Sequence, residues 1–221
     1  MAAITWDNSG KRIFEFGIDH GVLYPLNSKT NAYDTGVAWN GLTGVTETSA
    51  GAEASDMWAD NIKYGSIRST ETFSATIEAY TYPDEFSALD GQPELGKGIK
   101  VGQQTRAKFG VSYRTRIGND TAGDTHGYKL HLVYGLTASP SEKAYTTVND
   151  SPEGTTFSWE CQSDPVSVPD MKPTSIITID STLVDSAKLK TFEDLLYGGG
   201  STSTAPKLPL PDQVKQHFLA S

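Results

Sequence analysis

A period of two in the placement of apolar side chains is the feature that most constrains this chain. Between Thr72 and Tyr82 every second residue is apolar or small, and the residues in between are polar or aromatic. Successive side chains of a β-strand point to opposite faces of a sheet, so this spacing predicts a strand with one face in a core. The core-facing residues are Phe73, Ala75, Ile77, Ala79 and Thr81.

The same alternation recurs along the chain. In residues 108–117, Phe109, Val111 and Tyr113 alternate with a side that carries Arg114 and Arg116, which predicts a strand with a basic outer face. Further strand candidates are residues 12–18, 36–48, 61–67, 128–136, 156–161 and 175–180. Clusters of Gly, Pro, Asn and Ser separate them, so we predict a mainly β fold, a β-sandwich or barrel.

One flanking α-helix is predicted near the C-terminus. Leu189, Phe192 and Leu196 recur at helical spacing after Ser186, the expected N-cap, and Gly198 provides a stop. A chain of 221 residues buries one sizeable core, so we predict a single domain over residues 1–197. Residues 198–221 are expected to be a linker and a C-terminal arm, which docks on its own domain or on a neighbour's.

Residues 118–127, GNDTAGDTHG, are predicted to form a loop of about ten residues between two strands, longer than hairpins usually use. A loop of that length is mobile or has a partner. Asp120, Asp124 and His126 within it show neither the spacing of an EF-hand nor a bidentate acid at its end, so no metal site is predicted.

Composition disfavours several functions. The net charge of −9 argues against a surface that grips nucleic acid, because such binding neutralises phosphates with Lys and Arg. No apolar run approaches the roughly 20 residues that span a bilayer, and the N-terminus lacks the charged and then apolar segments of a secretory signal. We therefore expect no association with a membrane and assembly in the cytoplasm. Cys161 follows Phe157 and Trp159 on one face of a predicted strand, which favours a buried thiol over a nucleophile.

No catalytic or cofactor site is predicted. Glu78 with Asp84 or Glu85 is the nearest approach to a pair of catalytic carboxylates. Glu78 is expected on the solvent face of its strand, however, and the other two acids follow Pro83 in a predicted turn. Two carboxylates must face the same cleft to act as general acid and general base. We therefore interpret Asp84 and Glu85 as part of a solvated turn.

Charge is distributed in two blocks. Residues 97–116 carry six basic residues and no acid, and residues 78–94 carry five acids and no base. These blocks either pair within one subunit or steer head-to-tail self-association, and the sequence leaves both readings open. The candidate subunit interface therefore comprises Tyr80, Tyr82, Pro83, Asp84, Glu85, Phe86, Lys97, Lys100, Arg106, Lys108, Arg114, Arg116, Asn119, Asp120, Asp124 and His126.

Several long blocks of the chain carry a resemblance to one family. They are GVAWNGLTGVTET, GAEASDMWADNIKYGSIRSTETFSATIEAYTYPDEF, IKVGQQTRAKFGVSYRTRIGND, GYKLHLVYGLTASPSEKAYTTVNDSPEGTTFSWE and LPLPDQV. From about Gly21 to the C-terminus the sequence resembles the major tail proteins, or tail tube proteins, of long non-contractile-tailed bacteriophages.

The resemblance implies a structural virion protein without enzymatic activity. Family members form hexameric rings that stack into a hollow tail tube around a tape measure protein, between the tail terminator and the distal tail or baseplate proteins. Long loops and terminal arms bridge successive rings, and DNA passes through the tube without specific binding. A protein of acidic charge is consistent with that passage, because a basic wall would hold the phosphates.

A carbohydrate-binding β-sandwich module is the alternative, since exposed aromatic side chains stack on sugars. Its candidate residues are Trp39, Trp58, Tyr80 and Tyr82. A module of this kind would remain small and be stabilised by ligand, whereas a tube protein would form rings or polymers without one. A glycosidase that uses Glu78 with Asp84 or Glu85 comes third.

Overall fold

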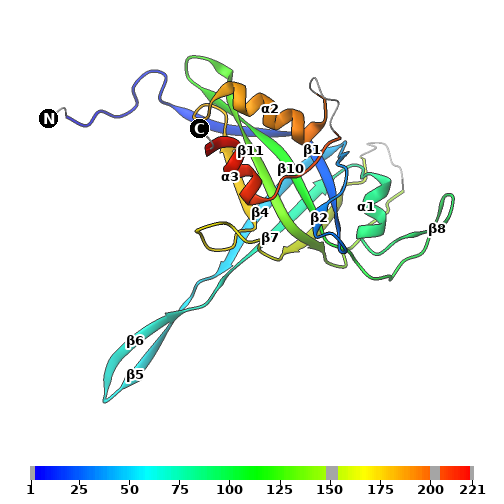
Figure 1. The fold of residues 1–221 in the computed structure, drawn as a ribbon, viewed down its shortest axis with the longest axis horizontal. Coiled ribbons are helices and arrows are strands. Elements are labelled where there is room, and N and C mark those ends of the chain that lie inside the picture. The colour runs from blue at the N-terminus through cyan, green and yellow to red at the C-terminus, as the bar shows by residue number, and fades with distance from the viewer. Residues whose placement is uncertain (1–2, 148–153, 200–204, 220–221) are drawn as a thin grey trace.

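The computed structural model describes residues 3–147, 154–199 and 205–219. Strands account for 48% of the residues and helices for 13%, so the predicted mainly β class is confirmed. The body is one large antiparallel sheet with helices on its outside, and a two-stranded ribbon projects far from it (Figure 1).

Nine strands form the large sheet in the order β2-β1-β10-β11-β12-β7-β4, with β13 paired to β11 and β3 to β1. Their bounds are β1 Ile13–Asn27, β2 Ala32–Tyr33, β3 Val37–Ala38, β4 Leu42–Gly51, β7 Glu71–Ala79, β10 Phe109–Asn119, β11 Gly123–Ala138, β12 Phe157–Ser163 and β13 Ile176–Asp180. Two smaller pairs are β5 Ala54–Ala59 with β6 Ile62–Arg68, and β8 Glu94–Gly96 with β9 Ile99–Lys100.

The sheet curls so that its far ends approach each other. β3 pairs with β1, and β4, which begins four residues after β3 ends, pairs with β7 at the other end of the strand order. The Trp39 backbone N–H between them donates to the Gly21 carbonyl of β1 at 2.8 Å. The result is close to a closed barrel, in which each strand has one face inside and one outside.

Each face of the curled sheet carries a core, and the outer core covers only part of its face. Inward side chains such as Val111, Ile77 and Trp159 form the first core, and Cys161 is fully buried among them. The second core lies on the outer face, where Leu132 and Tyr134 of β11 pack with the helices. Alternation along β11 thus supplies both cores, because neighbouring side chains point to opposite faces.

Helix α1, Asp84–Leu89, replaces the turn that the sequence predicted after Pro83. Its Phe86 is fully buried, with ring centroids 4.7 Å from Trp39 and 5.1 Å from Trp159. Proline at the N-cap fixes φ where a helix begins, and the apolar side chain three residues on then reaches the core. The short helix therefore contributes to the inner core.

The two C-terminal helices cover the outer face. The predicted flanking helix is α2, Ser186–Tyr197, with its N-cap one residue earlier than expected: Asp185 Oδ1 accepts from the backbone N–H groups of Ala187 and Lys188 at 3.0 and 2.9 Å. The C-terminal arm contains α3, Pro211–Leu219, whose Val214 joins the second core. The arm thus docks on its own domain, and residues 200–204 of the predicted linker lie outside the described residues.

Several strands differ from the prediction. Residues 36–48 were predicted as one strand, but the structure breaks it at residues 39–41, where Gly41 takes a φ of +73° and the chain crosses between the sheet's two ends. β1 continues to Asn27, well beyond the predicted end at residue 18. β5 was not predicted, because its residues ASDMWA show no clear apolar alternation.

Candidate assembly surfaces

The basic face predicted for residues 108–117 is exposed only in part. Lys108 and Arg116 are exposed as expected, with side-chain exposures of 47 and 51%, whereas Ser112 and Arg114 are covered. Ser112 is fully buried and lies 3.2 Å from the Tyr24 hydroxyl, beneath α2. The Arg114 side chain is 19% exposed, its guanidinium lies over the Tyr128 ring, and it approaches Glu193 of α2 at 3.8 Å. A period of two identified the alternation but not the helix that covers its polar side.

Asp19 on β1 accepts hydrogen bonds from both arginines of β10. Arg114 Nε donates to Asp19 Oδ1 at 2.8 Å, and Arg116 Nε donates to Oδ2 at 3.2 Å. Burial raises the pKa of Asp19, but the hydrogen bonds and the charge of Arg114, with hydrogen bonds from His20 and Arg116, outweigh it and lower the pKa to about 2. These charges therefore hold β1 to β10 within one subunit.

The other basic residues also find acids of their own subunit. The ion pairs join Lys100 to Asp84 at 3.0 Å, Arg106 to Asp90 at 3.7 Å, Lys143 to Asp90 at 3.2 Å and Lys108 to Asp164 at 2.7 Å. Two of these pairs, Lys100 with Asp84 and Arg106 with Asp90, join the basic block to the acidic block, and Lys108, Arg114 and Arg116 pair with acids elsewhere in the subunit. Among the described residues Lys97 forms no ion pair and stays exposed.

The acidic, aromatic corner divides into a buried and an exposed part. Phe86 was predicted to offer contact area to a neighbour, but it is fully buried in its own core and offers none. Tyr82 is half-buried, packed edge-on against Trp159 with ring centroids 5.3 Å apart. Tyr80 is 58% exposed and Glu85 is also exposed, so these two remain available at the surface.

The predicted ten-residue loop is a tight hairpin turn. β10 and β11 continue into it until Asn119 pairs with Gly123, and only residues 120–122 connect them. Buried Asn119 closes the turn by accepting from the Ala122 backbone N–H at 2.6 Å, and Asp120 accepts from Gly10 N–H at 2.9 Å. The side chains at these positions are mostly polar and show no apolar alternation, so the sequence did not indicate that the two strands continue.

The residues weighed as metal ligands do not converge. Asp120 contacts the N-terminal segment, whereas His126 Nδ1 lies 3.2 Å from Asn119 Nδ2. Within residues 3–147, 154–199 and 205–219, no group of three or more His, Cys, Asp or Glu side chains has the geometry of a metal site.

A polar cluster that the sequence did not reveal lies on the inner side of the sheet. Thr115 Oγ1 is 2.9 Å from His131 Nε2, and His131 Nδ1 is 3.2 Å from Glu47 Oε1. The Tyr113 ring stacks on the imidazole at 4.8 Å, and its hydroxyl donates to Glu47. A hydroxyl, an imidazole and a carboxylate in this order resemble a nucleophile with its base.

This cluster is better explained as a structural network. The stacked tyrosine leaves the His131 side chain only 11% exposed, and the same tyrosine takes up the carboxylate that would orient the imidazole. Burial and the Glu47 carboxylate raise the pKa of Tyr113, which therefore keeps its proton and remains a donor. The four residues link the β10–β11 hairpin to β4, which is distant in sequence, and no local motif encodes that contact.

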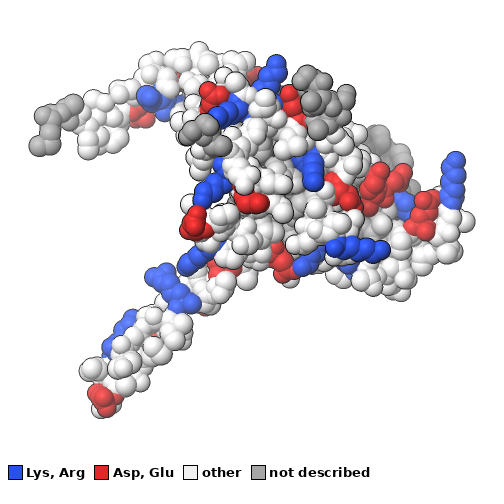
Figure 2. Space-filling model, viewed as in Figure 1, with Lys and Arg blue, Asp and Glu red and all other residues white. Residues whose placement is uncertain are grey.

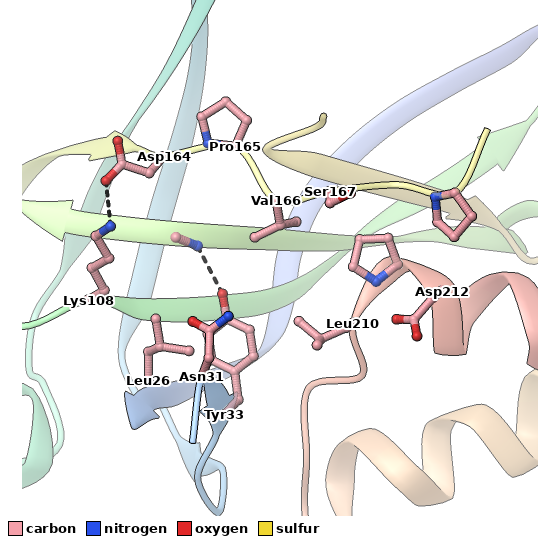
Figure 3. A pocket seen from close by; sticks show the side chains of 13 residues that line it. Leu26, Asn31, Tyr33, Lys108, Asp164, Pro165, Val166, Ser167, Leu210 and Asp212 are labelled. Atoms are coloured by element: carbon pink, nitrogen blue, oxygen red, sulfur yellow. Dashed lines mark hydrogen bonds and ion pairs between the residues drawn. The ribbon is translucent and has the colours of Figure 1, made fainter. Parts of the chain in front are cut away.

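A cavity of about 540 Å³ lies between β1, β2, the 164–169 segment and the C-terminal arm (Figure 3). Lys108 and Asp164 form an ion pair across its rim, and the Tyr33 hydroxyl accepts from the Gly135 backbone N–H at 2.9 Å. These contacts join segments of the wall to one another, and the polar residues Asn31, Ser167 and Asp212 also line the cavity.

The most exposed apolar surface lies on the β5–β6 ribbon. Every residue of β5 is exposed, and so is every residue of β6 except Gly65. Figure 2 shows the ribbon as mostly uncharged surface projecting from a body dotted with both charges. Its large exposed side chains are Met57, Trp58, Ile62, Tyr64 and Ile67, with exposed fractions of 41, 68, 64, 76 and 58%. Contiguous apolar surface on an extended element is typical of a protein contact.

The aromatic platform expected of a carbohydrate binder is not assembled. Trp39 is 3% exposed and its indole N–H donates to the Thr81 carbonyl at 3.0 Å, so it belongs to the core. Trp58 is on the ribbon and Tyr80 is on the body, after β7. Sugar stacking needs neighbouring exposed rings, and of the four candidates only these two remain well exposed.

A scan against models of known protein families gives no match to the chain, and a search of curated proteins gives none. In the described part of the chain, no helix has the length and apolarity to cross a membrane. These comparisons identify no family, so a proposal about function depends on the fold and on the surfaces described above.

Proposed function

We propose that this chain is a structural protein that assembles with copies of itself into rings and stacks the rings into the tail tube of a long-tailed phage. The observation that carries the proposal is the β5–β6 ribbon, which presents apolar side chains to water along its whole length. A two-stranded hairpin is marginally stable alone, so an extended one with exposed apolar residues favours a partner that covers it.

Repeated copies are the partner that the geometry favours. An arm that reaches from one side of a subunit to a different surface of the next makes a heterologous contact, which generates rings or open stacks. The body supports such use, because it has a core on each sheet face and many of its charges pair internally. The resemblance of the sequence to tail tube proteins points to the same assembly, with a tape measure protein and then DNA inside the tube.

The acidic composition suits a conduit for DNA. The chain carries a net charge of −9 while most of its basic block is held in internal ion pairs. A wall without free cations does not accumulate phosphates, and the phosphate contacts that dominate nucleic-acid binding are then missing. DNA is thus expected to pass through such an assembly without specific binding.

Negative-stain electron microscopy with light scattering across protein concentration tests the proposal. We expect rings or hollow tubes with a central channel, growing with concentration and without added ligand. A protein that stays monomeric at all concentrations, alone and with a tail initiator complex, would contradict it, and a glycan-dependent rise in Tm would favour the carbohydrate-binding alternative.

A further inference from the structure

The β5–β6 ribbon has two chemically different faces. Pairing places Met57 opposite Gly65 and Ala59 opposite Ile62, and the methyl end of Met57 lies across Gly65. Side chains of opposed residues share a face, so Met57, Ala59, Ile62 and Ile67 form one apolar face. This face contains no charge, and its own subunit leaves it uncovered.

The other face carries the charged side chains together with Trp58. Trp58 lies opposite Lys63, and Lys63 forms an ion pair with Asp56 at 2.7 Å. Asp60, in the turn between the two strands, has a φ of +50° and is exposed at the tip. The ribbon thus ends in a negative charge next to its apolar face (Figure 2).

A groove of matching chemistry lies on the body between residues 168–177 and α3, with a volume of about 510 Å³. Its wall is mainly apolar: Pro169, Met171, Pro173, Pro211, Val214 and Leu219. Met171 is 77% exposed and Leu219 is 73% exposed, large values for apolar side chains in a folded body. The charged residues of the wall are both basic, Lys172 and Lys215, of which Lys215 pairs with Asp170 at 2.8 Å.

We propose that the apolar face of the ribbon of one copy packs into this groove of a second copy, with Asp60 beside Lys172. This inference rests on the proposed self-assembly and names the surface that receives the arm. The apolar face of the ribbon would contact the apolar wall of the groove, and Asp60 at the ribbon tip would face the basic Lys172 at its rim. The prolines of the wall have no backbone N–H, so the ribbon would contact this wall through side chains. Because ribbon and groove are different patches, the contact repeats head to tail.

Cross-linking between two variants that each carry one introduced cysteine tests the pairing. Protein with Ile62→Cys is mixed with protein carrying Met171→Cys and treated with a short bismaleimide. Native Cys161 is silent, because it is fully buried and burial raises its pKa to about 12. The matched control replaces Met171→Cys by Leu183→Cys, at a residue 82% exposed and outside the groove.

We expect about tenfold more heterodimer from the Ile62 and Met171 pair than from the control pair, because a docked ribbon raises the local thiol concentration. Equal yields from a protein that forms rings or tubes would overturn the groove assignment and leave the proposed function standing. Equal yields from a protein that stays monomeric would overturn both.

A charge exchange checks the rim contact independently. Asp60→Lys alone and Lys172→Asp alone should each weaken self-association by about threefold, the size of an exposed ion pair, and the double variant should regain most of it. Sedimentation velocity across concentration measures the change. Two single losses that add in the double variant, without recovery, would show that these residues do not meet.

Discussion

The β10–β11 hairpin and the β5–β6 ribbon are built from the same antiparallel pairing but meet opposite environments. In the first, side chains of both faces enter a core, and Leu132 and Val133 are fully buried on opposite sides. In the second, all residues but Gly65 are exposed, although one face is apolar. Backbone pairing alone does not determine whether the faces of a hairpin are buried or exposed. What covers the faces decides whether a hairpin stabilises the subunit or serves contacts outside it.

The largest effect on the stability of the subunit is expected from Phe86→Ala, in the inner core to which β10 and β11 contribute. This residue is fully buried among three aromatic rings, so its truncation should lower the free energy of unfolding by about 3–5 kcal/mol. Urea denaturation followed by tryptophan fluorescence measures the loss. Tyr80→Ala, at an exposed aromatic of the same region, is the matched control and should change stability by no more than about 0.5 kcal/mol.

The second effect concerns the charges that join β1 to β10. Asp19→Asn should cost about 1–3 kcal/mol, because the partly buried Arg114 and the exposed Arg116 lose a charged acceptor. The folded pKa of about 2 lies below the ordinary 3.8, so this stabilisation is complete above about pH 4 and is lost as the pH falls toward 2. Thermal unfolding at pH 6, 4 and 2.5 should show a smaller acid loss in the variant. An unchanged acid profile would mean that Asp19 does not couple β1 to β10.

Paired arginines also limit an obvious assembly test. Reversing Arg114 and Arg116 to Glu would place two acids against Asp19 and, for Arg114, near Glu193, so the subunit itself would be destabilised. Loss of tubes in that variant would say little about subunit contacts. Substitutions on the ribbon separate folding from assembly more cleanly.

Sequence periodicity predicted the elements whose two faces differ. Ala75, Ile77 and Ala79 of β7 are buried as predicted, and Glu78 is exposed. Leu189, Phe192 and Leu196 of α2 pack as the helical spacing indicates. In both cases one face meets core and the other meets solvent, so the pattern reports the environment directly.

The misses have a common physical cause. Ser112 is polar yet buried because α2 covers it, and Asn119 is polar yet buried because it closes a turn. The Thr115–His131–Glu47 contacts join the β10–β11 hairpin to β4, which approaches it because the sheet curls. Contacts between segments far apart in sequence leave no local pattern, so neither the internal ion pairs nor this network was predictable residue by residue.

The inner polar network should contribute less than the charges on β1. Glu47→Gln is expected to cost about 1 kcal/mol, because the amide keeps the shape and loses the charged acceptor of Tyr113 and His131. Hydrogen bonding to the imidazole of His131, opposed by burial and helped by Tyr113, lowers the pKa of Glu47. The stabilisation is therefore present above the ordinary value of 4.5 and lost as the pH falls through the lower folded pKa.

Urea denaturation of Glu47→Gln at pH 7 and at pH 4 measures this contribution, with Glu78→Gln as control. Glu78 is an exposed carboxylate on the neighbouring strand β7, so its replacement should leave both values nearly unchanged. If both variants lose the same stability, the inner network adds nothing beyond a surface charge.

The smallest effect on the subunit is expected where the effect on assembly is greatest. Ile62→Ser removes an apolar side chain that is 64% exposed, so the free energy of unfolding should change by less than about 0.5 kcal/mol. A partner that buries this side chain would lose roughly 2 kcal/mol of apolar contact, about 30-fold in association. Unfolding curves and sedimentation of the same sample separate the two quantities. Lys63→Ser, at a neighbouring exposed position on the opposite face, is the control. Should both variants associate like the unmodified chain, the apolar face of the ribbon would be only an exposed surface, and the contrast with β10–β11 would lose its functional meaning.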